Sequence, residues 1–285
     1  MVPTLRFIVS NLRRARVCLG VAALALATAA HPANAQTPGF FNTDPGRPLK
    51  VEDASAVPRF ALDHYVASDW QNGSGDSPSA WFIRPGLLFG LVPRTQVEVD
   101  ATVALKRSAT DADAGLAGLR AAAQYTLNLE RGILPTLAFE ASMAFPVGDA
   151  ESAHSSVKTL ATKTFHWGRL HVNSEALFGD EPVTSPARLG LSRWQTGVAA
   201  DRAFTRRGLL AGAEVVARQT LDPESSVQWS VGGGVSQQLT PSMTIDFAGA
   251  LTFARSSRTF NVSIAFSRQV PFGAVMPGAG RWGRF

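Results

Sequence analysis

Residues 244–267 read TIDFAGALTFARSSRTFNVSIAFS, and apolar and polar side chains alternate along two runs of this stretch. In Thr244–Phe253 the odd-numbered residues are apolar or glycine, and Asp246 belongs to the opposite, polar face. In Thr259–Ser267 the apolar residues are the even-numbered ones, starting from Phe260. An alternation with period two places the apolar side chains on one face of a β-strand. The stretch therefore predicts two consecutive amphipathic strands.

The same alternation recurs upstream, in three further runs: Gln96–Leu105, Leu134–Phe145 and Val227–Ser236. Runs of about ten residues match a transmembrane β-strand and exceed the length of about 5–6 residues that is commonest in soluble proteins. A soluble β-sandwich alternates as well, so the pattern by itself leaves both architectures open. Two further segments, Val157–Phe165 and Leu189–Ala203, are patterned only weakly.

The connections between these runs fall into two classes by length. The short ones are Val92–Thr95, Asn128–Gly132, Trp167–Gly168, Thr205–Arg207 and Leu239–Ser242. The longer, more polar ones are Ser68–Ser79, Lys106–Ala114, Gly148–Ser156, Asp180–Ala187 and Gln219–Ser225, with Arg255–Arg258 as a short member of this class. Short and long turns that alternate are typical of a barrel with one rim in the periplasm.

We therefore predict an all-β fold, an antiparallel transmembrane β-barrel of about 12 strands with both chain ends in the periplasm. Lipid cannot satisfy backbone N–H and C=O groups, so a membrane-embedded sheet has to close on itself. The weakly patterned segments leave ten or fourteen strands as alternatives.

The first 35 residues predict a cleaved secretory signal peptide. Arginines precede an apolar run at 17–30, and Ala33-Asn34-Ala35 provides small residues at the cleavage site. The run is shorter than the roughly 20 residues of a spanning helix. An uncleaved N-terminal anchor is the alternative. The signal implies secretion to the periplasm, and together with the predicted barrel it predicts localisation in the bacterial outer membrane.

Removing this signal changes the composition. The formal net charge is +5 and the signal contains four arginines, so the rest of the chain carries about +1, and the basic pI gives no indication of nucleic-acid binding. Cys18, the only cysteine, lies in the signal, which excludes disulfides and cysteine-ligated metals from the processed protein. We predict no metal and no cofactor. The domain division is signal peptide 1–35, periplasmic segment 36–57, barrel 58–272 and C-terminal tail 273–285.

Aromatic residues cluster near the expected strand ends and predict interfacial girdles. They are Tyr65, Trp70 and Trp81 toward the outer rim, and Phe165, Trp167 and Phe204 toward the inner rim. Ordinary core aromatics are the alternative.

Charged and amide side chains fall on the polar faces, which are expected to line the lumen. They are Glu98, Asp100, Arg120, Gln124, Glu140, Glu175, Glu214, Arg218 and Asp246. They are candidates for solute selectivity. Charges that pair across a narrow lumen and only stabilise the barrel are at least as good an interpretation, because unpaired charges in a confined space are costly.

Two motifs resemble the outer-membrane transporter family named for the MetA pathway of phenol degradation. The first is Arg47-Pro48-Leu49-Lys50-Val51-Glu52-Asp53-Ala54, followed by Val57-Pro58 and a strand. The second runs from Leu134-Pro135-Thr136-Leu137-Ala138 to Phe145-Pro146-Val147-Gly148-Asp149. The resemblance implies a barrel of this size that passes small hydrophobic or aromatic compounds, and it supplies no catalytic residue. The chain departs from the usual pattern of barrels because Phe285 ends a Gly/Pro-rich tail rather than a strand.

Motifs for catalysis are few. Gly278-x-Gly280-x-x-Gly283 has the letters of a dinucleotide fingerprint but no helix to follow it, and Ser155-x-x-Lys158 lacks the other motifs of an acyl-enzyme. His154 with Ser155 or Ser156 is the candidate for an outer-membrane hydrolase, and Asp63-His64 is a weaker one. We predict that the protein is not an enzyme.

The sequence thus predicts an outer-membrane channel or passive transporter for small, hydrophobic or aromatic solutes. The alternative is a plugged structural or binding barrel without transport. The expected partners are outer-membrane lipid, a small-molecule solute and the barrel-assembly machinery, with no nucleic acid.

Overall fold

The computed structural model of the chain describes residues 49–72, 79–107, 112–145, 147, 153–179, 191–204, 207–221, 225–255 and 258–271. The expected signal peptide, the tail from residue 273 and the Gly278-x-Gly280-x-x-Gly283 motif lie outside these residues. Among the described residues, no helix is long and apolar enough to cross a membrane.

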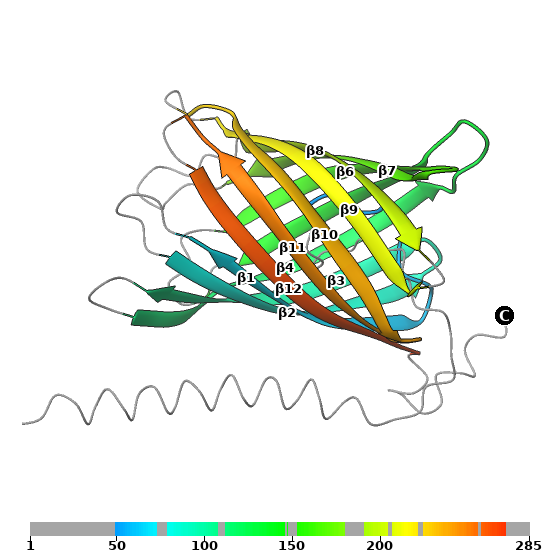
Figure 1. Cartoon of the computed structure of the whole chain (residues 1–285), viewed down its shortest axis with the longest axis horizontal. Helices are drawn as coiled ribbons and strands as arrows, with labels where there is room; N and C mark the ends of the chain where they lie inside the picture. The colour runs from blue at the N-terminus through cyan, green and yellow to red at the C-terminus, as the bar shows by residue number, and fades with distance from the viewer. Residues whose placement is uncertain are drawn as a thin grey trace, which may run out of the picture. The chain divides into compact units, whose positions relative to one another are not determined.

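The described residues form twelve strands, most of which are labelled in Figure 1. The first six are β1 (Ala61–Gln71), β2 (Ser79–Val92), β3 (Thr95–Arg107), β4 (Ala112–Asn128), β5 (Thr136–Phe145) and β6 (His154–Phe165). The others are β7 (Gly168–Phe178), β8 (Leu191–Phe204), β9 (Leu209–Thr220), β10 (Gln228–Thr240), β11 (Met243–Phe253) and β12 (Arg258–Pro271).

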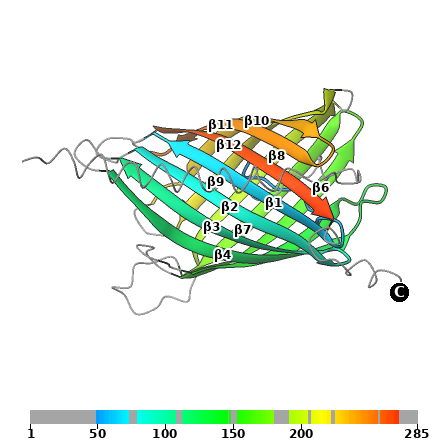
Figure 2. The ribbon, with the colours of Figure 1, turned by 90° about the horizontal axis from the view of Figure 1, so that it is seen from below.

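Each strand pairs antiparallel with its neighbours in sequence, and β12 pairs with β1 to close the barrel. Closure brings Ala61 opposite Pro271 and Gln71 opposite Asn261. Figure 2 shows the tilted strands from a second direction. The closed twelve-stranded barrel confirms the predicted fold, and the two weakly patterned segments form β6 and most of β8.

The connections keep the predicted alternation of short and long. Ser68 and the residues up to Gln71, which were expected to begin the first long connection, instead continue β1. They extend the strand because they pair on both sides, as Ser68 does with Ile83 of β2 and Ile264 of β12. Because this part of β1 forms backbone hydrogen bonds with a strand on each side, its N–H and C=O groups have partners without water.

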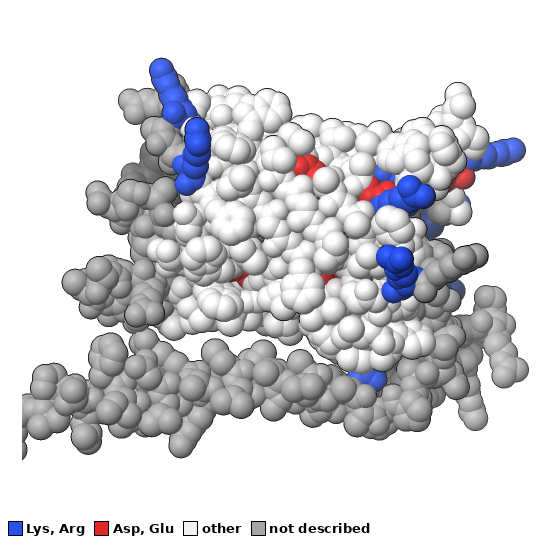
Figure 3. Space-filling view, in the orientation of Figure 1, with Lys and Arg blue, Asp and Glu red and all other residues white. Residues whose placement is uncertain are grey.

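The outer surface of the barrel is apolar. Val99, Phe139, Val215 and Phe247 are among the large hydrophobic side chains exposed on the strands. On the face shown in Figure 3 the Lys and Arg side chains gather at the two ends, and between them only a few atoms of Asp and Glu are visible among uncharged residues. An apolar band flanked by polar rims is the surface that a bilayer solvates.

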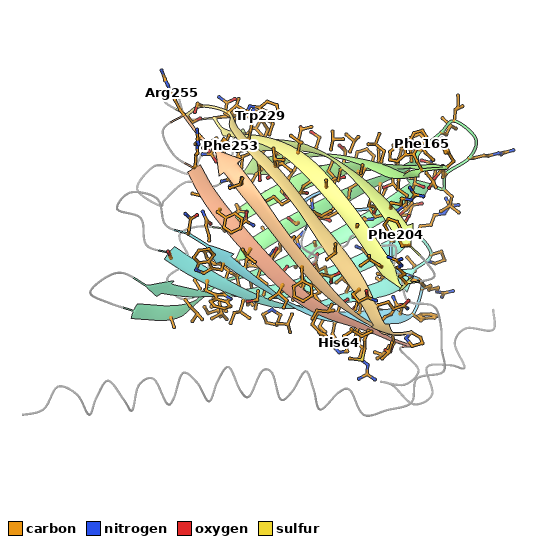
Figure 4. All side chains as sticks on the ribbon, viewed as in Figure 1. His64, Phe165, Phe204, Trp229, Phe253 and Arg255 are labelled. Carbon is orange, nitrogen blue, oxygen red and sulfur yellow. The ribbon has the colours of Figure 1, made fainter. Side chains whose placement is uncertain are left out.

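Aromatic side chains lie near both rims, as Phe165, Phe204, Trp229 and Phe253 show in Figure 4. Phe165 stacks on Trp167 at the β6–β7 turn, with 5.3 Å between ring centroids. Tyr65, which was predicted to be at the outer rim, instead points into the barrel and is buried. Its inward direction follows from strand parity, since Ala61, Asp63 and Ala67 are buried on the same face.

Candidate functional site

All nine side chains predicted to line the lumen lie on inward-facing positions of the strands. Glu98 and Asp100 come from β3, Arg120 and Gln124 from β4, Glu140 from β5, Glu175 from β7, Glu214 and Arg218 from β9, and Asp246 from β11. The structure brings some of them into direct contact and keeps others apart. Their role in selectivity stays a prediction.

Arg120 is the centre of a buried charge cluster. Its guanidinium donates to Oε2 of Glu98 and to Oε1 of Glu140, each at 2.7 Å, and to Oδ2 of Asp100 at 3.2 Å. The hydroxyl of Tyr65 donates to the other oxygen of Glu98 at 2.6 Å. These side chains therefore pair within the wall of the lumen, which is the structural interpretation left open by the sequence.

The other predicted residues are distributed around the lumen. Gln124 accepts a hydrogen bond from Nε2 of Gln96 at 3.3 Å. Asp246 is fully buried, and Glu175 lies directly across from Lys158 in the β6–β7 register. Only part of the predicted set thus belongs to one cluster.

The segment that precedes β1 lies inside the barrel. Residues 36–57 were predicted to be a periplasmic segment, and the structure describes 49–57 of these, which pack against inward-facing side chains. Val51, Ala54 and Val57 are buried, and Val51 contacts the position of Gly197 on β8. Burial of these apolar side chains away from water stabilises the segment in the lumen. The polar groups between them form hydrogen bonds and ion pairs with side chains of the barrel wall.

Hydrogen bonds attach the backbone of this segment to opposite walls. The amide of Val57 donates to Oε1 of Gln96 on β3 at 2.8 Å. The amides of Lys50 and Val51 donate to Oε2 of Glu214 on β9, at 2.7 and 2.9 Å. Six steps separate β3 from β9 in either direction around the closed barrel, so these two strands face each other. Residues 49–57 therefore cross the full width of the lumen.

Hydroxyl groups hold the middle of the segment. The amide of Ala54 donates to Oγ1 of Thr162 on β6 at 3.0 Å, and its carbonyl accepts from Oγ1 of Thr126 on β4 at 2.8 Å. The amide of Ala56 donates to the same Thr126 hydroxyl at 3.2 Å. These side chains thus provide the hydrogen bonds that the backbone of a segment without regular secondary structure would otherwise form with water.

Ion pairs reinforce this attachment. The ammonium of Lys158 lies 2.8 and 2.9 Å from the two carboxylate oxygens of Glu52, and Nη1 of Arg169 lies 2.6 Å from Oδ2 of Asp53. Arg169 also binds Asp201. Burial raises the pKa of Glu52, which precedes the first strand, to about 7, although the Lys158 ammonium acts in the opposite direction.

A cavity of about 560 Å³ occupies the part of the lumen toward the long connections. The crossing segment provides Leu49, Lys50 and Glu52 to its lining. The strands provide Tyr65, Asp69, Phe82, Arg84, Asp100, Arg120, His154, Lys158, Glu175, Arg218, Thr252 and Asn261, among others. A concave site of this volume suits a small organic molecule. The lumen thus has a chamber on one side of the segment.

Sequence reasoning missed several of the lumen residues, namely Lys50, Glu52, Asp53, Lys158, Arg169, His171 and Asp201. The position of Lys158 on the same strand face as Ser156 and Thr162 could have predicted that it points into the lumen. The alternation along this strand is too weak for that face to be recognised from the sequence. Residues before the first strand carry no alternation that could indicate a lumen.

The hydrolase candidates do not come together. Oγ of Ser156 lies 2.8 Å from Oγ of Ser142, and among the described residues no hydrogen bond joins His154 to Ser155 or Ser156. Asp63 points into the barrel, whereas His64 lies on its outer side (Figure 4).

No protein-family model matches the chain, and no curated protein matches its sequence. Among solved structures, the chain is similar to the COG4313 outer-membrane channel from Pseudomonas putida F1, with a TM-score of 0.59 and 12% identity over 80% of this chain and 99% of that one. The NanC porin gives a TM-score of 0.52 and 8% identity over 72% and 98% of the two chains. The KdgM porin in complex with oligogalacturonate gives 0.50 and 8% over 73% and 98%. The chain has the closed antiparallel fold of these outer-membrane β-barrels.

Proposed function

We propose that the protein is a passive channel of the bacterial outer membrane for small, apolar or aromatic solutes, and that residues 49–57 constrict its lumen. The observation that carries the proposal is a cavity of about 560 Å³ inside a closed barrel with an apolar exterior. The solute class is supported by the sequence motifs that resemble the MetA-pathway family. The names of the similar structures, an outer-membrane channel and two porins, support passive transport in general.

A second function, a plugged binding barrel, is favoured by one specific observation. The segment is bound by side chains on opposite walls, through Gln96 on one side and Glu214 on the other. A channel requires that this segment moves aside or leaves a path beside it. A plugged barrel requires that it stays.

An engineered disulfide distinguishes the two functions. A Cβ at Gly197 would lie 2.6 Å from Cγ2 of Val51, so a Val51→Cys, Gly197→Cys double variant places two sulfurs within bonding reach. Cys18 lies in the expected signal peptide, so the processed protein offers no competing thiol. The Cys variants are reconstituted in planar bilayers, oxidised or reduced, with each single variant as a control.

A segment-constricted channel conducts when reduced and loses most of its conductance when oxidised, whereas the single variants conduct in both states. Osmotic swelling of liposomes with uncharged solutes of increasing size then measures the free path. A reduced protein with no conductance and no solute-induced swelling would contradict the channel and support the plugged barrel. Equal conductance in both redox states would show that solutes pass beside a fixed segment.

A further inference from the structure

Most of the charges that line the cavity neutralise one another. Arg84 pairs with Asp69, with 2.7 Å between Nη2 and Oδ2. Arg120 and Lys158 bind the carboxylates of the β3–β5 wall and of the segment, as described above. Among the described residues, two lining cations form no ion pair, Lys50 and Arg218.

Lys50 reaches the wall formed by β10. Its ammonium donates to Oγ of Ser230 at 3.3 Å, and its backbone amide binds Glu214. Glu214 accepts two backbone amides, and it is not part of the cavity lining. Burial and the neighbouring Arg218 guanidinium lower the pKa of Lys50, which precedes the first strand, although the carboxylates of Glu214 and Asp69 act in the opposite direction.

Arg218 lies on the adjacent strand at nearly the same depth. Its Nε donates to Oε1 of Gln228 at 2.8 Å. Gln228 is opposite Arg218 in the β9–β10 register, and Ser230 is two residues further along the same face. The two cations thus approach one part of the cavity from neighbouring positions. Nε of Arg218 is held by an amide oxygen, which carries no charge to neutralise the guanidinium.

The same cavity has an apolar side. Phe82 of β2, Ala117 of β4 and Ala144 of β5 provide apolar lining on one wall, and Leu49, whose Cδ1 lies beside Gly212 of β9, provides it near the two cations. A solute with an apolar body and one anionic group therefore finds contacts for both parts. Carboxylate is the anionic group whose two oxygens match a guanidinium, and a nearby ammonium adds a further charge-assisted hydrogen bond.

We propose that the cavity is a binding site for small organic carboxylates, such as an aromatic acid, and that Lys50 and Arg218 bind the carboxylate. This proposal adds to the proposed channel function by naming a charged group on the solute. It rests on that function only for the claim that the bound carboxylate is the solute that the channel passes. Glu175 is the nearest lining carboxylate along the strand register: it lies opposite Gln195 of β8, which in turn lies opposite Arg218 of β9.

Fluorine NMR of the full-length, detergent-solubilised protein tests the site with 3-fluorobenzoate and its neutral analogue 3-fluorobenzamide. We expect the benzoate to bind more tightly than the benzamide. Arg218→Gln and Lys50→Gln are each expected to weaken benzoate binding by roughly 10- to 100-fold, the range for a charge-assisted hydrogen bond. Neither substitution is expected to change benzamide binding.

Three further variants control for folding and for bulk charge. Arg218→Lys retains the charge and should recover part of the affinity. Glu175→Gln removes the nearby negative charge and should strengthen benzoate binding. Arg255→Gln removes an exposed cation at the end of the barrel (Figure 4) and should leave binding unchanged. Heat-modifiable migration on gels confirms that each variant is folded.

The outcomes separate this proposal from the channel itself. Equal affinity for benzoate and benzamide, or an unchanged affinity in a folded Arg218→Gln variant, would overturn the carboxylate site while leaving conductance untouched. Specific benzoate binding by a protein that shows no conductance and no swelling would retain the site and reject the channel.

Discussion

The ammonium of Lys158 lies 2.8 Å from Oε1 of Glu52, and this ion pair joins strand β6 to the segment that precedes β1. The two residues are 106 positions apart in sequence. Both are buried, and Lys158 also lies 3.3 Å from Oε1 of Glu140. One cation thus holds a carboxylate of the wall and a carboxylate of the segment together.

Lys158→Met should release the segment. Without the ammonium, Glu52 and Glu140 face each other in a desolvated site, and removing one partner of a buried pair typically costs about 3–5 kcal/mol. Withdrawal of residues 49–57 returns Glu52 to water and relieves this cost. We expect a higher mean conductance in planar bilayers and faster amide hydrogen exchange at residues 49–57.

The effect of Lys158→Met should depend on pH. Burial raises the pKa of Glu52 from its ordinary value of 4.5 to about 7 even beside Lys158. A carboxyl with a raised pKa favours the docked state when protonated, so docking is restored toward pH 4.5 and lost as the pH rises through the docked pKa of Glu52, which loss of the Lys158 ammonium raises further. Lys163→Met, which removes a cation from the partly exposed pair with Glu130, is the matched control and should show neither effect. Unchanged conductance of Lys158→Met at pH 8 would contradict the prediction.

Arg120→Met should destabilise the barrel strongly. The substitution leaves Glu98, Asp100 and Glu140 without their shared partner, and the expected loss is about 3–5 kcal/mol in the free energy of unfolding. Arg84→Met breaks one partly exposed pair with Asp69 and should cost at most about 1 kcal/mol. Urea titration in detergent, read by heat-modifiable migration, compares the two. Similar losses for both variants would show that the Arg120 cluster is not a special source of stability.

Val99→Arg should destabilise the barrel if the outward face of β3 contacts lipid. Val99 is 56% exposed near the middle of β3, where hydrocarbon would solvate it. An arginine at the bilayer midplane costs about 2–4 kcal/mol in transmembrane barrels. Ile133→Arg, at a turn position that is 92% exposed, places the same charge in water and should be nearly neutral. Unfolding in lipid bilayers gives the comparison, and equal costs would argue against a membrane-embedded band.

Gly86→Ala should disturb the Tyr65–Glu98 hydrogen bond. An added Cβ at Gly86 would lie 2.3 Å from Cζ and 2.4 Å from the hydroxyl oxygen of Tyr65, so the ring has to move. Loss of a hydrogen bond to a buried charged group costs about 1–3 kcal/mol. At Gly118 the nearest atom is 3.6 Å from an added Cβ, and Gly118→Ala is the control that should be tolerated. The same urea titration measures both, and a wild-type midpoint for Gly86→Ala would refute the prediction.

The fold could be predicted from the sequence because a strand in a barrel wall has two faces in different solvents. Ile245 and Phe247 face out of the barrel and Asp246 faces the lumen, so their alternation is a local property of the chain. Tyr65 was misplaced because an aromatic side chain near a strand end was expected to face lipid. Its hydroxyl instead binds Glu98, a partner 33 positions away.

The crossing segment could not be predicted in the same way. Val51-Glu52-Asp53-Ala54 has no period, and its charged residues read as exposed. Its partners Lys158 and Glu214 are 106 and 163 positions away from the residues that they bind. Lys158 and Glu214 come close to the segment only when the barrel is closed.

Covalent continuity between Val57 and β1 makes the segment an intramolecular ligand of its own barrel. The chain bends at Phe60, with a positive φ of 61°, and leads into β1 at Ala61. A short tether of this kind typically gives an effective concentration in the millimolar range, which dilution does not change. A solute that competes for the same wall groups with equal intrinsic affinity would have to reach that concentration to displace the segment. In the proposed channel, the solute concentration that displaces the segment therefore depends on chain connectivity as well as on binding strength.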